Sequence, residues 1–170
     1  MIWFSGLPCS GKSTLSKKLL EYVPNMEILD GDSELINALR STERSKESRI
    51  IHAGRVAYLA KLLLKHKIPV CAAVISSFQE GRKIAREIIG SDIFIETYLK
   101  CSLKVCEKRD VKGMYKKARN GKLDNFCGVT APYEIPENPE LIIDTENNTI
   151  EDCAIQVLNY LKSKNLVPSI

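Results

Sequence analysis

The sequence predicts an α/β fold in which a central parallel sheet carries helices on both faces. Short apolar runs typical of buried strands alternate along the chain with segments of helical spacing. One run, residues 70–75, is apolar at every position, as expected for a central strand that is covered on both faces. A chain of 170 residues is long enough for one core and too short for two full domains. We therefore expect residues 1–170 to form a single domain.

The first half of the chain begins with an apolar run at residues 2–5, which predicts a buried strand. Helical spacing follows at residues 14–22, and residues 26–29 predict a second strand. A longer helix is expected over residues 48–66, where apolar residues recur at helical intervals. It ends before Pro69, because proline cannot continue a helix.

The second half repeats the alternation of helix and strand. Residues 80–89 and 102–109 have helical patterns, and the apolar run at residues 93–99 between them predicts another strand. A short final strand is expected at residues 141–143, and a closing amphipathic helix at residues 150–164. This alternation of strands and helices implies a parallel sheet with helices on both faces.

The stretch between the first strand and the first helix fits the phosphate-binding pattern G-x-x-x-x-G-K-[ST] at every fixed position. Gly6 and Gly11 allow the backbone to approach phosphate oxygens, and the start of the helix adds a favourable potential. Lys12 would reach the β- and γ-phosphates of ATP, and the Ser13 hydroxyl would ligate the bridging Mg²⁺. The alternative, a glycine-rich turn without a ligand, is disfavoured by the strand before it and the helix after it. The expected ATP-binding residues are Gly6, Leu7, Pro8, Cys9, Ser10, Gly11, Lys12, Ser13 and Thr14.

Composition narrows the classes of function. The net charge of +4 is small and basic residues alternate with acidic ones, so we expect no nucleic-acid partner. No apolar run is long enough to cross a bilayer and the sequence begins directly in a strand, so we expect a cytoplasmic protein without a membrane segment or signal peptide. The six cysteines form no C-x-x-C pair, which favours small buried side chains over disulfides or structural zinc.

Residues 110–139 interrupt the regular pattern. This segment is polar, is rich in glycine and proline, and carries five basic residues between Lys112 and Lys122. In a chain with a phosphate loop we interpret it as a lid that closes over bound phosphates, excludes water and brings cations to the transferring group. The alternative is a solvated surface loop that contains a short helix.

Asp30-Gly31-Asp32 comes at the carboxyl end of the second strand, where ligands of open parallel sheets collect. Such carboxylates can hold the water around Mg²⁺ and accept a proton from an attacking hydroxyl, so we expect Asp32 and Lys12 to be catalytic. The alternative is a polar turn in which Asp32 caps the next helix. The base-reading motif Asn-Lys-x-Asp of GTP switches and the signature of transporter ATPases are both absent from the sequence. These features favour a small-molecule kinase.

Several further motifs are spread along the chain beside the phosphate loop: residues 29–32, 59–62, 75–78, 106–119 and 133–137, and Arg82. In these motifs the chain resembles the adenylylsulfate kinase family, which transfers the γ-phosphate of ATP to the ribose 3′-hydroxyl of a nucleotide. The resemblance implies a three-layer P-loop nucleoside-triphosphate kinase fold with a lid, Asp32 at the acceptor hydroxyl, Asp30 beside the metal, and Arg109 on the ATP side. Around the acceptor nucleotide it implies Arg49, Ile75, Ser76, Lys112 and Phe126.

The chain departs from the family pattern on the acceptor side. Leu35 stands where the family usually has an arginine, Arg44 where an aromatic usually stacks on the adenine, His52 where it has an asparagine, and Ser77 where it has a proline. Losing a stacking face costs roughly 1–3 kcal/mol, so a different acceptor is expected. A divergent branch of the family phosphorylates cytidine diphosphoramidate in capsule biosynthesis, and Arg44 and His52 could hydrogen-bond a cytosine edge.

Three alternatives remain open at this level. The departures could be neutral changes in an ordinary adenylylsulfate kinase. A regulatory module could bind ATP without turnover, although Asp30, Asp32 and the lid cations argue against it. A kinase for a non-nucleotide substrate is disfavoured by Phe126 and the lid motif. The expected partners are therefore ATP, Mg²⁺ and a nucleotide acceptor, with a homodimer as a further expectation.

Overall fold

The computed structural model describes residues 1–166. Its five strands form one parallel sheet in the order β2-β3-β1-β4-β5, which confirms the parallel sheet predicted from the sequence. The carboxyl ends of the strands therefore meet at one edge of the sheet. The strands are β1 Ile2–Ser5, β2 Glu27–Asp30, β3 Val70–Ala73, β4 Ile95–Lys100 and β5 Leu141–Asp144.

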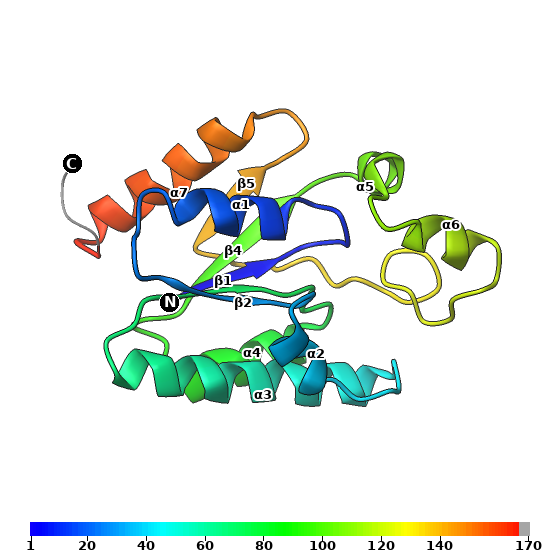
Figure 1. Cartoon of the computed structure of the whole chain (residues 1–170), viewed down its shortest axis with the longest axis horizontal. Coiled ribbons are helices and arrows are strands. Elements are labelled where there is room, and N and C mark those ends of the chain that lie inside the picture. The colour runs from blue at the N-terminus through cyan, green and yellow to red at the C-terminus, as the bar shows by residue number, and fades with distance from the viewer. Residues whose placement is uncertain (167–170) are drawn as a thin grey trace.

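Helices cover both faces of the sheet and produce three layers. In Figure 1, α1 and α7 lie on one face and α3 and α4 on the other, while α5 and α6 lie at one end of the molecule. The layered arrangement is the one predicted from the alternation of helices and strands. The helices are α1 Lys12–Leu19, α2 Glu34–Ala38, α3 Lys46–Lys65, α4 Gln79–Ile89, α5 Leu103–Arg109, α6 Met114–Arg119 and α7 Ile150–Ser163.

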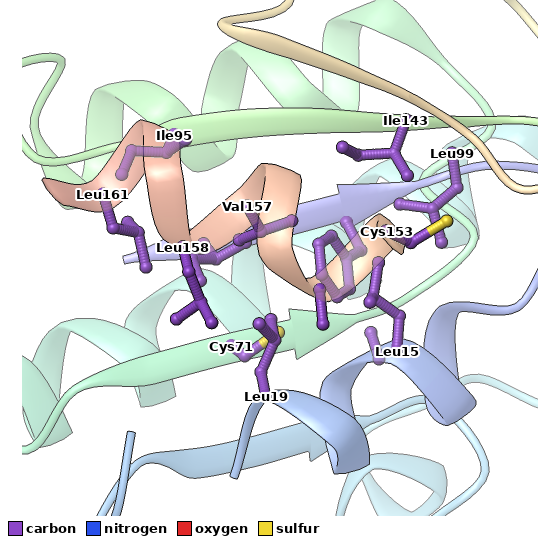
Figure 2. Close-up of a cluster of buried hydrophobic side chains, with 14 of the residues drawn as sticks. Leu15, Leu19, Cys71, Ile95, Leu99, Ile143, Cys153, Val157, Leu158 and Leu161 are labelled. Atoms are coloured by element: carbon purple, nitrogen blue, oxygen red, sulfur yellow. The ribbon is translucent and has the colours of Figure 1, made fainter. Parts of the chain in front are cut away.

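The sheet separates two of the three apolar clusters of the described residues, and the third lies around α5 and α6. Ile2 and Phe4 of β1 face one cluster, with side chains of α1 and α7, while Trp3 faces the other, with side chains of α3 and α4. Figure 2 shows the first cluster, in which Leu15 of α1 and Val157 of α7 lie over the strands. Alternation of side chains across a strand that is covered on both faces explains why Ile2, Trp3 and Phe4 are all apolar.

Several boundaries differ from the sequence prediction. Helix α1 begins at Lys12, two residues early, and α2 was not predicted. The Ser33 hydroxyl caps α2 by accepting a hydrogen bond from the amide of Ile36 at 3.3 Å, so the alternative in which Asp32 caps this helix is wrong. Strand β3 ends at Ala73 instead of residue 75, because the chain leaves the sheet before Ser76, which has a φ of 48°.

Two further observations concern the composition. Five of the six cysteines are buried and all six are free thiols, as expected for small apolar side chains. Within residues 1–166, every helix is too short or too polar to cross a membrane.

Candidate functional site

A pocket of about 930 Å³ lies at the carboxyl edge of the sheet, between the phosphate loop, the end of β2, α3 and the segment after α5. Most of the residues singled out in the sequence line it, although they come from widely separated parts of the chain. Those lining it are Pro8, Cys9, Gly11, Lys12, Ser13, Thr14, Asp30, Asp32, Arg44, Arg49, His52, Ile75, Ser76, Arg109, Lys112 and Phe126.

Three residues of the expected ATP site, Gly6, Leu7 and Ser10, do not line the pocket. Gly6 has a φ of 155°, and an added Cβ would lie 2.9 Å from the carbonyl oxygen of Leu99, so glycine is required there. Leu7 packs against the buried cluster of Cys101, Cys106, Tyr115, Ala118 and Phe126, and Ser10 is fully buried. The motif defines the whole loop, whereas only part of the loop faces the cavity.

Lys12 lies inside the phosphate loop with its ammonium group turned towards loop oxygens. The Nζ atom donates to the carbonyl oxygens of Gly6 at 2.9 Å and Leu7 at 2.7 Å, and to Ser10 Oγ at 3.3 Å. Burial lowers the pKa of Lys12 from its ordinary value of 10.5 to about 8. The loop therefore holds a poorly solvated cation beside the pocket, which is the arrangement that favours an anionic ligand.

The start of α1 supplies further groups for an anion. Its N-cap is Gly11, with a φ of 98°, and no side chain of residues 1–166 caps the helix. The amides of the first turn are thus left for another acceptor, and the positive end of the helix favours negative charge. Ser13 and Asp30 also line the pocket, and their oxygens are of the kind that Mg²⁺ prefers.

Arg109 holds the outer side of the phosphate loop in place. Its guanidinium donates to the carbonyl oxygens of Thr145 at 2.6 Å and Cys9 at 3.4 Å. The Thr145 hydroxyl in turn donates to the carbonyl oxygen of Ser10 at 2.8 Å. The loop that follows β5 is therefore tied to the phosphate loop by two side chains, one of which, Thr145, carried no signal in the sequence.

Asp32 extends from the end of β2 into the mouth of the pocket, where its side chain is 60% exposed. Its carboxylate pairs with the ammonium group of Lys112 at 2.8 Å, although the two residues are far apart in the sequence. The Asp30 carboxylate accepts a hydrogen bond from the amide of Asp32 at 2.9 Å, which fixes the turn. A cation of the expected lid thus meets the carboxylate expected to act on the acceptor hydroxyl.

Ser76 is held by two residues to which the sequence assigned no role in the site. The indole Nε1 of buried Trp3 donates to Ser76 Oγ at 3.0 Å, and Arg82 donates to the Ser76 carbonyl oxygen at 2.7 Å. Arg82 also forms a buried ion pair with Glu96 at 2.8 Å. An indole N–H can only donate, so Ser76 Oγ accepts from Trp3 and keeps its own proton for another partner.

Arg49 connects α3 to the chain just before Phe126. Its guanidinium donates to the carbonyl oxygen of Asn125 and also reaches Ser77 Oγ at 3.5 Å. Phe126 is 6% exposed and lines the pocket. The residue before the aromatic expected beside the acceptor is therefore tied to α3 by Arg49.

The residues that depart from the family pattern lie partly in the pocket wall and partly outside it. Arg44 and His52 line the pocket, whereas Leu35 lies on α2 with 55% of its surface exposed and outside the pocket wall. Neither imidazole nitrogen of His52 has a hydrogen-bond partner in residues 1–166. Burial, followed by the charge of Arg40, lowers the pKa of His52 below its ordinary value of 6.5, so the ring is neutral at pH 7. A neutral imidazole offers one donor and one acceptor.

Arg40 was missed in the sequence and also lines the pocket. It donates to the carbonyl oxygen of Gly31 at 2.9 Å, beside the two candidate carboxylates. Its position eight residues after Asp32 lies outside any motif, so only the folding of α2 against the strand ends brings it to the site.

Comparison with known proteins agrees with this geometry. Residues 1–144 match the adenylylsulphate kinase family. An adenylyl-sulfate kinase from Oceanobacillus iheyensis is 42% identical over 98% of this chain and 86% of its own length, and one from Clostridium kluyveri is 40% identical over 96% and 84%. The structure of an APS kinase from Mycobacterium tuberculosis in complex with AMPPNP and APS has a TM-score of 0.85 and 34% identity, over 95% of this chain and 96% of that one. The fold is thus the expected P-loop kinase fold, and the chain belongs to the adenylylsulphate kinase family of phosphotransferases.

Proposed function

We propose that this protein transfers the γ-phosphoryl group of ATP to the 3′-hydroxyl of adenylylsulfate. The observation that carries the proposal is that Lys12 of the phosphate loop and Asp32 at the end of β2 line one pocket, as phosphoryl donor and acceptor sites must. The names of the relatives support adenylylsulfate as the acceptor, as does the similar structure described with AMPPNP and APS. This acceptor is better supported than the cytidine diphosphoramidate favoured from the sequence.

In the proposed mechanism the chain positions two substrates and stabilises charge. The amides at the start of α1 and the Lys12 ammonium group would hold the β- and γ-phosphates. Ser13 and Asp30 would hold Mg²⁺ and its water, and the metal ion would offset negative charge on the transferring group. Asp32 would accept the proton of the 3′-hydroxyl or orient it for in-line attack. Lys112 would leave its pair with Asp32 and neutralise charge on the transferred phosphoryl group.

The acceptor nucleotide would lie between Arg49, Ser76 and Phe126. The Ser76 hydroxyl, which accepts from Trp3, would donate its own proton to a phosphate oxygen of the acceptor. The Phe126 ring would stack on the base, an interaction worth roughly 1–3 kcal/mol. These roles extend the family resemblance to the residues that line the pocket in this chain.

A second acceptor, cytidine diphosphoramidate, is favoured by one specific observation. Arg44 and His52 both line the pocket where the family pattern has an aromatic and an asparagine, and the two imidazole nitrogens of His52, both buried, have no hydrogen-bond partner in residues 1–166. A cytosine edge presents an exocyclic amine beside a ring nitrogen, which a neutral imidazole and a guanidinium can hydrogen-bond. An acceptor with a less anionic end would also suit a pocket to which Leu35, outside its wall, contributes no cation.

A parallel assay with the two nucleotides tests the choice. Purified protein is incubated with ATP and Mg²⁺ and either adenylylsulfate or cytidine diphosphoramidate, and the phosphorylated nucleotide is quantified by mass spectrometry. The proposal expects the larger kcat/KM with adenylylsulfate. A larger value with the cytidine compound would overturn this acceptor in favour of the second. ATP consumption without any phosphorylated nucleotide would contradict both.

Matched variants sharpen the same assay. Arg44→Phe restores an aromatic at the base, and we expect it to raise kcat/KM for adenylylsulfate by about tenfold, the worth of a stacked base. Lys61→Phe replaces an exposed cation of α3 that lies outside the pocket, and it serves as the control. The cytoplasmic location and the homodimer expected from the sequence stay predictions.

A further inference from the structure

Tyr115 contacts both halves of the proposed site without lining the pocket itself. It lies on α6, in the green segment at the end of the molecule in Figure 1, and its side chain is fully buried. Its hydroxyl donates a hydrogen bond of 2.9 Å to the carbonyl oxygen of Pro8, in the phosphate loop. Its ring meets that of Phe126 edge to face, with 4.9 Å between the centroids and 84° between the planes. One side chain therefore joins the donor loop to the aromatic of the acceptor side.

The position of Tyr115 is fixed by its own segment. Gly113 adopts a φ of 64° before α6, which turns the chain sharply. The Asp110 carboxylate then accepts hydrogen bonds of 3.0 Å from the amides of both Tyr115 and Lys116. Because the start of α6 is held in this way, the Tyr115 ring has little freedom to move independently of the lid segment.

A second contact links the same two segments. Gly128 lies directly against Leu7, the loop residue before Pro8, because a Cβ on Gly128 would be 2.8 Å from Leu7 Cδ2. Residues 126–131 form a closed turn, in which the Phe126 amide donates to Thr130 Oγ1 at 2.8 Å and the Gly128 amide to the carbonyl oxygen of Ala131 at 2.8 Å. Phe126 and Gly128 thus move as one unit that rests on the phosphate loop.

We propose that Tyr115 is a positioning residue that couples occupancy of the phosphate loop to the placement of Phe126. A polyphosphate bound to the loop amides fixes the Pro8 carbonyl, and the Tyr115 hydroxyl transmits that position to the ring against Phe126. Coupling between two binding sites is reciprocal, so an acceptor nucleotide stacked on Phe126 increases the affinity for ATP by the same factor. The acceptor part of this inference rests on the proposed function, while the effect of the donor on Phe126 does not.

The test compares Tyr115→Phe with wild type. This variant keeps the edge-to-face ring pair and removes only the hydroxyl. Amide hydrogen exchange of residues 126–131 is measured with and without AMPPNP, an unreactive ATP analogue. We expect the analogue to slow exchange in wild type, and we expect that protection to be smaller in Tyr115→Phe by about two- to tenfold, the usual worth of one hydrogen bond. Tyr58→Phe is the control, because the Tyr58 side chain is exposed on α3.

Calorimetry supplies the second readout. The factor by which AMPPNP increases the affinity for adenylylsulfate should fall about two- to tenfold in Tyr115→Phe, while each ligand alone binds within about twofold of wild type. Unchanged protection of residues 126–131 in the variant would overturn the inference. An equal fall in the affinity for AMPPNP alone would also overturn the inference, since that result indicates that Tyr115 has a purely structural role. Failure of wild type to bind adenylylsulfate would contradict the proposed acceptor, and the exchange experiment would still decide the role of Tyr115.

Discussion

Replacing Lys12 by methionine separates what this lysine contributes to binding from what it does to stability. Burial lowers its pKa from 10.5 to about 8, and each pKa unit corresponds to about 1.4 kcal/mol. The charged lysine therefore costs the folded protein about 3 kcal/mol at pH 7. Removing it leaves the Gly6 carbonyl without its Lys12 donor, which costs about 1–3 kcal/mol. Lys12→Met should thus change the free energy of unfolding by between zero and about 2 kcal/mol, in the stabilising direction.

The dependence on pH gives the sharper signature. Below about pH 8 the lysine is protonated in both states, so the full cost of burying the charge is present. Between about pH 8 and 10.5 the folded protein has lost this proton and the unfolded chain keeps it, so unfolding takes up a proton and stability rises with pH. Above pH 10.5 the lysine is neutral in both states and the cost is gone. Between about pH 8 and 10.5 the free energy of unfolding of wild type should therefore rise by about 3 kcal/mol relative to that of Lys12→Met.

Urea unfolding at a series of pH values measures the free energy of unfolding of wild type and of Lys12→Met. Other titrating groups contribute equally to both proteins, so their contributions cancel in the difference. Lys17→Met, an exposed position on the same helix, is the control and should follow wild type. Phosphoryl transfer by Lys12→Met should fall at least a hundredfold, about 2.7 kcal/mol of lost charge stabilisation. A difference curve that is flat from pH 7 to 10.5, or a variant destabilised by more than about 2 kcal/mol, would refute this reasoning.

Two further predictions concern side chains around the pocket. Arg82→Met should lower the free energy of unfolding by about 3–5 kcal/mol, because it leaves Glu96 short of a partner for its buried charge and frees the Ser76 carbonyl. Calorimetry should then show a Tm lower by about 6–20 °C, and a fall under 3 °C would contradict the assigned burial cost. Lys112→Ala should change stability by less than about 0.5 kcal/mol, since its ion pair is exposed, yet lower kcat by about tenfold or more. Lys104→Ala, a lysine of α5 outside the pocket, should leave kcat unchanged in the same assay.

Local patterns in the sequence are enough to predict most of the sheet and the donor half of the site. Strand β3 is apolar at every position because both of its faces are covered, and that pattern is visible without a structure. The phosphate loop is a contiguous motif in which each fixed residue has a steric or charge requirement, so the sequence predicts Lys12 and Ser13 directly. The prediction of Asp30 and Asp32 follows from their place at a strand end.

Tertiary contacts determine the features that the sequence did not reveal. Helix α2 is only five residues long, too short for a periodic pattern, and depends on the Ser33 cap. The early end of β3 reflects the left-handed backbone of Ser76, which Trp3 and Arg82 hold from distant elements. The link between Tyr115 and Pro8 spans more than a hundred residues. Such contacts depend on packing between elements, and no local pattern encodes them.

On the expected acceptor side, the similarity to adenylyl-sulfate kinases and the side chains of the pocket wall favour different acceptors. The overall similarity extends over nearly the whole chain, yet Arg44 and His52, which line the pocket, depart from the family pattern. An identity averaged over the whole chain says little about any two side chains of the pocket wall. The acceptor is therefore decided by the pocket, and the parallel assay addresses it directly.

The phosphoryl-transfer mechanism depends most on the role of Asp32. Rapid-quench measurement of 3′-phosphorylated nucleotide, with saturating ATP, compares wild type with Asp32→Asn, a nearly isosteric change at an exposed position that should preserve the fold. We predict that the rate of transfer falls about 10²–10⁴-fold while the affinity for ATP stays within about twofold. An Asp32→Asn protein that transfers phosphate at close to the wild-type rate would contradict the mechanism.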